Sequence, residues 1–225
     1  MLKLQMEKLL LFLVVIAPCW TADLSGKVVI FSRESNSDHV KLKTSKTALS
    51  SVSTCLRFKT DLTRAYSLLS VATASHFNDF LLFKPETSAV RVHARDDMAD
   101  FQSLVLAPNT WHSMCSTWNA ENGLAQLWLN GSPTIKRFIK TGQITGALSA
   151  ILGQDQDTFG GGFDAKQSFV GMLHNFHMWD HVLPASEIRQ YMNGMYFTPG
   201  NVFSWKDLQY ELSGSVFIEN VADVV

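Results

Sequence analysis

The sequence predicts an all-β protein, a sandwich of two antiparallel sheets with one short helix in the C-terminal half. Three observations favour this class. Several short segments alternate apolar and polar residues, an Asn-Gly pair joins two of them as a tight turn, and a single late segment has a helical pattern. The chain has 225 residues, 46% of them hydrophobic, which suits one domain with a buried core.

The first half supplies three predicted strands, at 27–31, 39–43 and 52–59. In 52–59 the alternation places Phe58 on one face and Cys55 on the other. We therefore expect Phe58 to point into the core, and Cys55 to face a neighbouring strand on the opposite side.

The clearest hairpin spans residues 125–138. Asn130-Gly131-Ser132 begins with an Asn-Gly pair, which supplies the positive φ angles of a type I′ turn. The same tripeptide is a glycosylation sequon, weakened by Pro133 directly after it. Residues 168–180 are apolar on both faces, which indicates a strand inside a sheet rather than at its edge.

The one predicted helix covers residues 184–193. Proline is tolerated in its first turn, Ile188 and Tyr191 form an apolar stripe, and Gly194 can end it. The stripe predicts that the helix packs flat against a sheet.

The N-terminus predicts a secretory signal peptide over residues 1–20, cleaved somewhere in 19–22. Two lysines precede an apolar run at 9–16, followed by small residues. This run is too short to span a bilayer. The mature domain would cover 23–225, secreted and extracellular without transmembrane anchoring. A net charge of -1 without basic runs argues against nucleic acid as the main partner.

Cleavage would leave two cysteines, Cys55 and Cys115. An even pair in an oxidising compartment is most simply one disulfide, the alternative being two buried thiols.

Residues 153–167 gather oxygen-bearing side chains around a triple glycine. They are not an EF-hand loop, because its fifth and twelfth positions would be Phe159 and Lys166. Calcium still accepts six to eight oxygens in loose geometry, so a calcium loop and a solvated acidic loop both stay open here. The candidate ligands are Asp155, the Gln156 backbone, Asp157, Asp164 and Gln167.

Other chemistries have weaker signals. His174 and His177 lie three apart on a predicted strand, so they point to opposite faces unless a bulge intervenes, which argues against a zinc site. The sequence contains neither a nucleophile elbow nor a phosphate-binding loop. A sandwich-fold glycosidase using the carboxylates of 155–164 remains an alternative at this point.

Four segments resemble the pentraxin family. They are HSMCSTW, ILGQDQDTFGGGFDAKQSFVG, MWDHVL and VFSWKDLQYELSGSVF, and the resemblance extends from Asp23 to about Ile218. It implies a jelly-roll sandwich assembled as a cyclic pentamer, without enzymatic activity. It also implies two calcium ions on one face of each subunit.

The resemblance assigns the calcium ligands. In the second loop, 75–80, Asn78 and Asp79 match, whereas Phe77 stands where the family has an aspartate. In the first loop the resemblance implies Asp155, the Gln156 carbonyl, Asp157, Asp164 and Gln167. It further implies that His112, one residue farther from Cys115 than in the family, marks an insertion or bulge beside the disulfide.

By the same resemblance, calcium would bind the phosphate of phosphocholine, with choline against Phe83 and Leu81. His93 would narrow this pocket, and Asp96 or Asp97 would be the nearest acids. The implied function is calcium-dependent pattern recognition in innate immunity and the acute phase, with complement components or phagocyte receptors as further partners. The alternative is a calcium-dependent, lectin-like binder of acidic or phosphorylated carbohydrates, which Phe77 and His93 favour.

Overall fold

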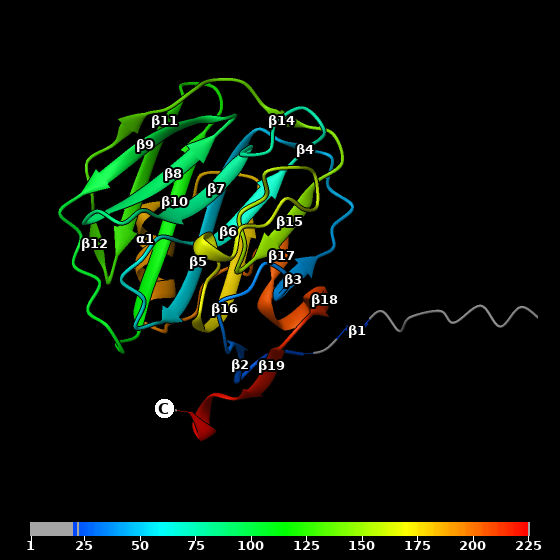
Figure 1. Cartoon of the computed structure of the whole chain (residues 1–225). Coiled ribbons are helices and arrows are strands. Elements are labelled where there is room, and N and C mark those ends of the chain that lie inside the picture. The colour runs from blue at the N-terminus through cyan, green and yellow to red at the C-terminus, as the bar shows by residue number, and fades with distance from the viewer. Residues whose placement is uncertain (1–19, 22, 225) are drawn as a thin grey trace, which may run out of the picture.

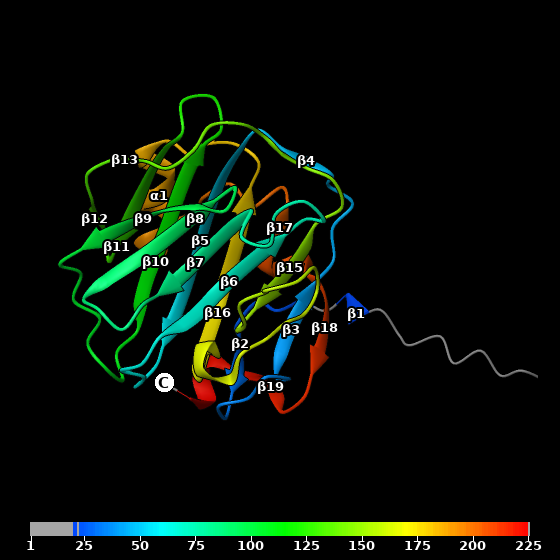
Figure 2. The ribbon, with the colours of Figure 1, turned by 45° about the horizontal axis from the view of Figure 1, so that its top comes forward.

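A computed structural model describes residues 20–21 and 23–224. Two large antiparallel sheets face each other, and the single α-helix of the described residues lies behind the second sheet, on its outer side (Figures 1 and 2). The predicted signal peptide falls on residues 1–20, of which only Trp20 is described. The predicted two-sheet sandwich with one helix at 184–193 is confirmed.

The first sheet has eight strands within the described residues. In spatial order they are β1 (Trp20–Thr21), β18 (Gln209–Ser213), β3 (His39–Leu42), β15 (Ser149–Leu152), β6 (Tyr66–Ala72), β7 (Phe80–Lys84), β8 (Ala89–Ala94) and β9 (Asp97–Gln102).

The second sheet has nine strands in the same described part. Its main path runs through β12 (Ser132–Pro133), β11 (Leu124–Leu129), β10 (His112–Asn119), β5 (Ser51–Lys59), β16 (Gly171–Trp179), β2 (Lys27–Phe31) and β19 (Val216–Asn220), with β13 (Arg137–Phe138) beside β11 and β17 (Phe203–Ser204) beside β16. The remaining elements are β4 (Ala48–Leu49), β14 (Ile144–Thr145), α1 (Ala185–Met192), η1 (Ala165–Gln167), η2 (Trp205–Asp207) and η3 (Val221–Asp223).

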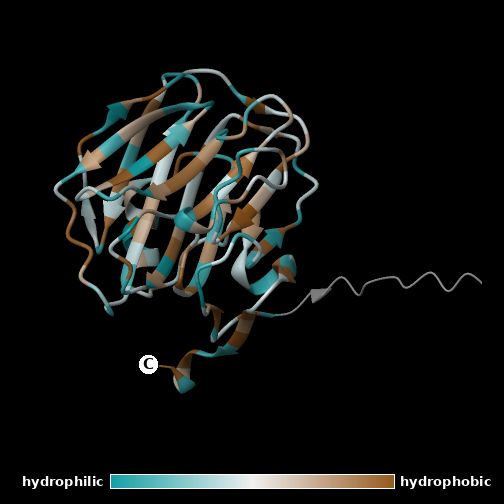
Figure 3. Ribbon diagram, in the orientation of Figure 1, coloured by the Kyte–Doolittle hydropathy of each residue, from teal (hydrophilic) through white to brown (hydrophobic). Residues whose placement is uncertain are grey.

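The core fills the space between the two sheets. Strand alternation sends Phe58 of β5 and Leu82 of β7 inward, and both are fully buried. Hydrophobic segments follow the strands of both sheets, while hydrophilic ones dominate the loops (Figure 3). This core fixes the register of each strand, because a slip of one residue would turn its apolar side chains to the opposite face.

The outer face of the second sheet carries a second buried cluster around the disulfide. Cys55 and Cys115 are directly opposed on β5 and β10, their Cα atoms are 4.1 Å apart, and they form the predicted bond. Helix α1 packs Ile188 and Tyr191 onto this cluster. The predicted positions of Phe58 and Cys55 on opposite faces are thus confirmed.

The predicted turn at Asn130-Gly131 joins β11 to β12, with φ angles of 49° and 88°. The Asn130 amide is engaged on both sides. Its oxygen accepts from the Ser113 N–H at 2.8 Å, and its nitrogen donates to His112 Nδ1 at 3.1 Å. We therefore expect little glycosylation at this sequon.

The structure corrects one expectation about β10. Its pairing with β5 runs without a shift from His112 opposite Phe58 to Asn119 opposite Ser51. No bulge lies beside the disulfide within this ladder, because the longer spacing simply extends the pairing by one residue.

A bulge does occur in β16, between His174 and His177, where Asn175 has a φ of 53°. With this bulge, His174 lies opposite Arg57 and His177 lies opposite Cys55. Because Arg57 and Cys55 share the outer face of β5, both histidines face outward on the same side. Each packs against aromatic rings, His174 on Trp111 and His177 between Trp179 and Phe197.

Candidate cation and ligand site

The acidic loop leaves the first sheet at the end of β15 and folds back over its outer face. Gly153 begins it with a φ of 88°, and a Cβ there would lie 2.3 Å from the Phe31 ring. Only glycine fits this turn without displacing Phe31. The loop is therefore directed toward Ser70 on the neighbouring strand β6.

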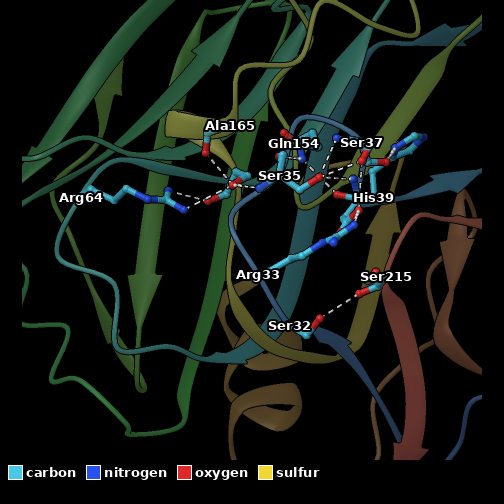
Figure 4. A network of polar contacts seen from close by, with 11 residues as sticks. Ser32, Arg33, Ser35, Ser37, His39, Arg64, Gln154, Ala165 and Ser215 are labelled. Carbon is cyan, nitrogen blue, oxygen red and sulfur yellow. Dashed lines mark hydrogen bonds and ion pairs between the residues drawn. The ribbon is translucent and has the colours of Figure 1, made fainter.

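The start of the loop is anchored by the buried side chain of Gln154. Its amide nitrogen donates to the carbonyl oxygens of Ser35 at 2.6 Å and Asp38 at 3.0 Å (Figure 4). Asp38 is itself buried and ion-paired with Arg33 at 2.9 Å. A segment far away in sequence thus holds the residue that precedes Asp155.

The end of the loop is anchored by Arg64, which reaches it from the opposite side (Figure 4). The guanidinium donates to the Ser168 carbonyl at 2.6 Å and to the Lys166 carbonyl at 3.2 Å. Glu34 accepts from both Arg64 and Lys166, at 3.0 and 2.8 Å. The two ends of the loop are therefore fixed independently, with the candidate ligands between them.

Gln156 is held by its side chain and leaves its backbone oxygen available. The amide nitrogen donates to Ser70 O, Ser70 Oγ and Ser149 O at 3.0–3.1 Å, and the amide oxygen accepts from Gly160 N at 2.9 Å. The Gln156 carbonyl accepts no hydrogen bond from a described residue. This is the arrangement that a carbonyl ligand requires.

The second loop joins β6 to β7 and ends at Asp79, which is fully buried. Thr73 Oγ1 donates to Asp79 Oδ2 at 2.5 Å, while Asp79 Oδ1 has only Arg95 Nε at 3.8 Å. One carboxylate oxygen is thus committed to the protein, and the other faces a cation at a distance too long for a hydrogen bond.

Asp96 positions this loop rather than facing a ligand. Its carboxylate accepts from the Asn78 N–H at 2.9 Å and contacts His76 Nδ1 at 2.7 Å. His76 in turn lies 3.0 Å from the Arg95 guanidinium. Asp97 accepts from the Met98 N–H at 2.9 Å. Of the two acids nearest the expected choline pocket, Asp96 is therefore engaged, whereas Asp97 is exposed and uses only one oxygen.

The two loops share a property found nowhere else among the described residues. They hold every buried carboxylate or amide oxygen that lacks a hydrogen-bond partner in that part of the chain, namely those of Asn78, Asp79, Gln154, Asp155 and Gln167. Buried oxygens without donors are costly, and a cation would satisfy them. Four of these five residues are predicted calcium ligands, so the residues present fit calcium.

Burial perturbs both buried carboxyl groups in the same direction. It raises the pKa of Asp155 to about 7, with help from the neighbouring Asp157 charge. Burial also raises the pKa of Asp79, against the opposing influence of Thr73, His76 and Arg95. Each group therefore lacks sufficient positive charge around it to stabilise its ionised form.

The other predicted ligands are placed differently. Asp157 and Asp164 are exposed, and Asp164 caps η1 by accepting from the Lys166 N–H at 2.9 Å. Across the described chain, no group of three or more His, Cys, Asp or Glu residues is gathered to hold a metal. The candidate site thus depends on two buried carboxylates together with amide and backbone oxygens.

The outer face of the first sheet continues from these loops along β7. Leu81 and Phe83 point outward and belong to neither buried cluster, and they are only 1% and 9% exposed. Leu81 lies opposite His93, which lies opposite Met98. Burial lowers the pKa of His93 to about 4, so this ring is neutral at physiological pH. The surface beside the candidate cation site is therefore largely apolar.

One charged pair borders Phe83. Arg91 lies directly opposite Phe83 in the β7–β8 ladder. Its Nε and Nη2 atoms donate to the two oxygens of the Asp100 carboxylate, at 2.6 and 2.9 Å. Phe83, Arg91 and Asp100 form one row across the described strands β7, β8 and β9, and this row contains no carboxylate without an ion-pair partner.

Several residues that build the site were not predicted from the sequence. Gln154 and Arg64 anchor the first loop, Ser70 holds Gln156, and Thr73 and Asp96 hold the second loop. Gln154 was signalled by its position inside the acidic segment, and Asp96 was expected beside the choline pocket rather than as a support of the loop. The other three are polar residues of ordinary appearance, whose role depends on contacts across strands.

The structure combines a jelly-roll sandwich with two oxygen-rich loops on one outer face and a disulfide on the other. The chain belongs to the pentaxin family, whose model matches residues 27–220. Proteins of this family recognise ligands and are not enzymes, which sets the glycosidase alternative aside. They bind calcium and act in innate immunity, so a calcium-dependent recognition role is supported for this chain.

The relatives cover almost the whole chain. Serum amyloid P-component of Sus scrofa is 38% identical, with 95% of this chain and 98% of the relative covered. C-reactive protein of Homo sapiens is 38% identical, with 94% and 97% covered. The sequence resemblance to the pentraxins, and among them to these two proteins, is confirmed.

Solved structures agree on the fold. A heptameric SAP-like pentraxin from Limulus polyphemus matches with a TM-score of 0.80 at 21% identity, over 88% of this chain and 97% of that one. The described residues contain no helix with the length and apolar character to cross a membrane.

Proposed function

We propose that this protein is a secreted, calcium-dependent pattern-recognition molecule that binds phosphocholine-type ligands on microbial or damaged-cell surfaces. The observation that carries the proposal is the set of buried, unpartnered oxygens at Asn78, Asp79, Asp155 and Gln167. Hard cations take six to eight such oxygens, and calcium tolerates the mixed, irregular geometry that two loops provide.

Two calcium ions would occupy the site. Asn78, Asp79, Asp155, the Gln156 carbonyl, Asp157, Asp164 and Gln167 would hold them. Bound calcium supplies positive charge that can bind the oxygens of a phosphate group directly. The two exposed aspartates, Asp157 and Asp164, would then turn toward the ions on binding, whereas Asp79 and Asp155 are buried.

The ligand's second part would lie along β7. Leu81 and Phe83 offer an apolar surface next to the cation loops, and an aromatic face also attracts a quaternary ammonium group. The edge of Phe83 is the part that a ligand can reach, since 9% of the residue is exposed.

Assembly would multiply a weak single site. We propose a cyclic homo-oligomer, a pentamer, whose subunits present their calcium sites on one face and gain avidity on repetitive surfaces. Relatives named as serum proteins support secretion. Complement components or phagocyte receptors would be the partners of the opposite face.

A second candidate ligand is favoured by the contacts around Phe83. Asp96 is engaged within the protein, and Asp100, which shares a ladder row with Phe83 and Arg91, is bound by Arg91. A choline group therefore has no free carboxylate in this row, and an acidic or phosphorylated carbohydrate would need none. Calcium would bind its anionic group in the same way.

The test is retention of the purified protein on immobilised phosphocholine in calcium, with elution by chelator or free phosphocholine. Asp79→Asn should abolish retention, whereas Asp61→Asn, at an exposed aspartate away from the loops, should leave it unchanged. Calcium-dependent retention on phosphorylated sugars but not on phosphocholine would favour the second ligand. Retention without calcium would contradict both.

A further inference from the structure

A cavity of about 310 Å³ lies at the far end of β7 from the calcium loops. Asp79 directly precedes β7 and Lys84 ends it, so five residues of extended chain, roughly 16 Å, separate the two sites. The cavity opens between the two sheets. Its walls come from the segment before β6, the β7–β8 turn and the β9–β10 connection.

The walls of this cavity combine polar side chains with an apolar part that three leucines dominate. Leu62, Leu104 and Leu106 line it, and all three pack against the main core as partly buried side chains. Ligand sites typically start at about 300 Å³, so this volume suits a small molecule. The leucines could cover an aliphatic chain.

Tyr66 lines the same cavity and supplies a hydroxyl group. The residue is 1% exposed, and its ring contacts Phe58 and Phe169, with ring centres 6.4 and 5.6 Å away. Its hydroxyl makes no hydrogen bond to any residue that the structure describes. This hydroxyl is not one of the fully enclosed polar atoms without a partner, so it is reachable from the cavity and free to donate to a ligand there.

Lys84 contributes a positive charge directly opposite Tyr66 in the β6–β7 ladder. It shares the inward-facing side of the strand with Leu82. The ammonium group donates to Pro85 O at 2.6 Å and Thr87 O at 2.7 Å, which leaves one of its three hydrogens. None of the described carboxylates, including that of Glu86 on the cavity wall, forms an ion pair with it.

We propose that this cavity binds a small amphipathic carboxylate, independently of calcium. Its aliphatic chain lies between Leu62, Leu104 and Leu106, and its carboxylate accepts hydrogen bonds from the Lys84 ammonium and the Tyr66 hydroxyl. The occupant is inferred from charge complementarity, since an inward-facing ammonium without a carboxylate partner and a hydroxyl without a protein acceptor can both donate to a carboxylate. Side chains of similar length on directly opposed residues can reach the same group.

The experiment is calorimetric titration of the purified protein with octanoate, octanol and octylammonium in the presence of a chelator. We expect octanoate to bind with one site per subunit, octanol about tenfold more weakly, and octylammonium not at all. Methyl NMR signals of Leu62, Leu104 and Leu106 should shift with octanoate, which locates the site without any variant. Absence of octanoate binding, equal affinity for octanol, or unshifted leucine signals would each overturn the proposal.

Variants test the two polar groups. Lys84→Met keeps the aliphatic stem and should weaken octanoate at least about tenfold, and Tyr66→Phe should weaken it severalfold. Lys136→Met, at an exposed lysine, is the control and should change nothing. Circular dichroism verifies folding. Unchanged affinity in both folded variants, or octanoate binding that requires calcium, would contradict this assignment.

Discussion

The two outer faces of the sandwich handle buried polar atoms in opposite ways. On the first sheet, the unpartnered atoms include carboxylate and amide oxygens, all within the two loops. On the second sheet they include the ring nitrogens of Trp111 and Trp128 and the Arg57 Nε, together with serine hydroxyls. Oxygens of this kind attract a cation and N–H donors repel it, so among the described residues the two loops of the first face are the better candidate for calcium.

The faces also differ in what holds them rigid. The second face is fixed covalently by Cys55–Cys115 and covered by α1. The first face relies on hydrogen bonds: Gln154 donates to the Asp38 carbonyl, Arg64 donates to the Ser168 carbonyl, and Asp96 accepts from the Asn78 N–H. Stability is therefore expected to come from the second face and binding from the first, and each can be perturbed separately.

Removing the disulfide should have the largest effect. Replacing Cys55 and Cys115 by alanine should lower the free energy of unfolding by about 4 kcal/mol, because a closed loop of 60 residues restricts the unfolded chain. Chemical denaturation measures this. Calcium affinity of the folded variant should be unchanged; a parallel loss of calcium binding would show that the two faces are coupled.

Removing a buried carboxylate of the first face comes next. Asp79→Asn should weaken calcium about a hundredfold while leaving the fold intact, since the side chain keeps its size but loses its charge and one of its two oxygens. Calorimetric calcium titration gives the affinity, with Asp61→Asn as the matched control. Equal affinities of the two variants would remove Asp79 from the site.

Acidification should act on the first face through Asp155, whose pKa is raised to about 7. Calcium needs the ionised carboxylate, so affinity should be about tenfold lower at pH 6 than at pH 8.

The stability of the calcium-free protein should change with pH in the opposite direction. The folded state binds the proton more tightly than the unfolded chain, so stability falls as the pH rises from about 4 through 7. Asp155→Asn should remove both trends, and a pH-independent affinity in the wild type would contradict this reading.

The Arg95 charge should have the smallest effect. Its Nε lies 3.8 Å from Asp79 Oδ1 and would repel an incoming ion. Arg95→Gln should therefore tighten calcium roughly threefold to tenfold, whereas Arg95→Lys, which keeps the charge, should not. Weaker binding in both variants would mean that Arg95 matters mainly for holding His76 and Gln143.

Much of the fold was predictable because its signals are local. Alternation located β5 and its two faces, Asn130-Gly131 located the turn, and the ends of α1 follow Pro184 and Gly194. The bulge in β16 was not predictable, since it depends on Asn175 adopting a positive φ against the pairing of β5.

The sequence predicted the acidic residues of the candidate site. It did not predict the residues that hold the two loops in place by hydrogen bonds. Local crowding of oxygen marks 153–167, but nothing local indicates that Gln154 reaches the carbonyls of Ser35 and Asp38. Asp96 shows the same limitation. It looked available to a ligand, and instead it holds Asn78, because the β8–β9 turn brings it against the second loop.

The most direct test of the central claim is a crystal structure of the protein grown with calcium. We predict ions within about 2.3–2.6 Å of Asp79 Oδ1, Asp155 Oδ1, Asn78 Oδ1 and the Gln156 carbonyl oxygen. A structure in calcium whose loops bind no ion, with these oxygens bonded to water or protein donors, would contradict the account.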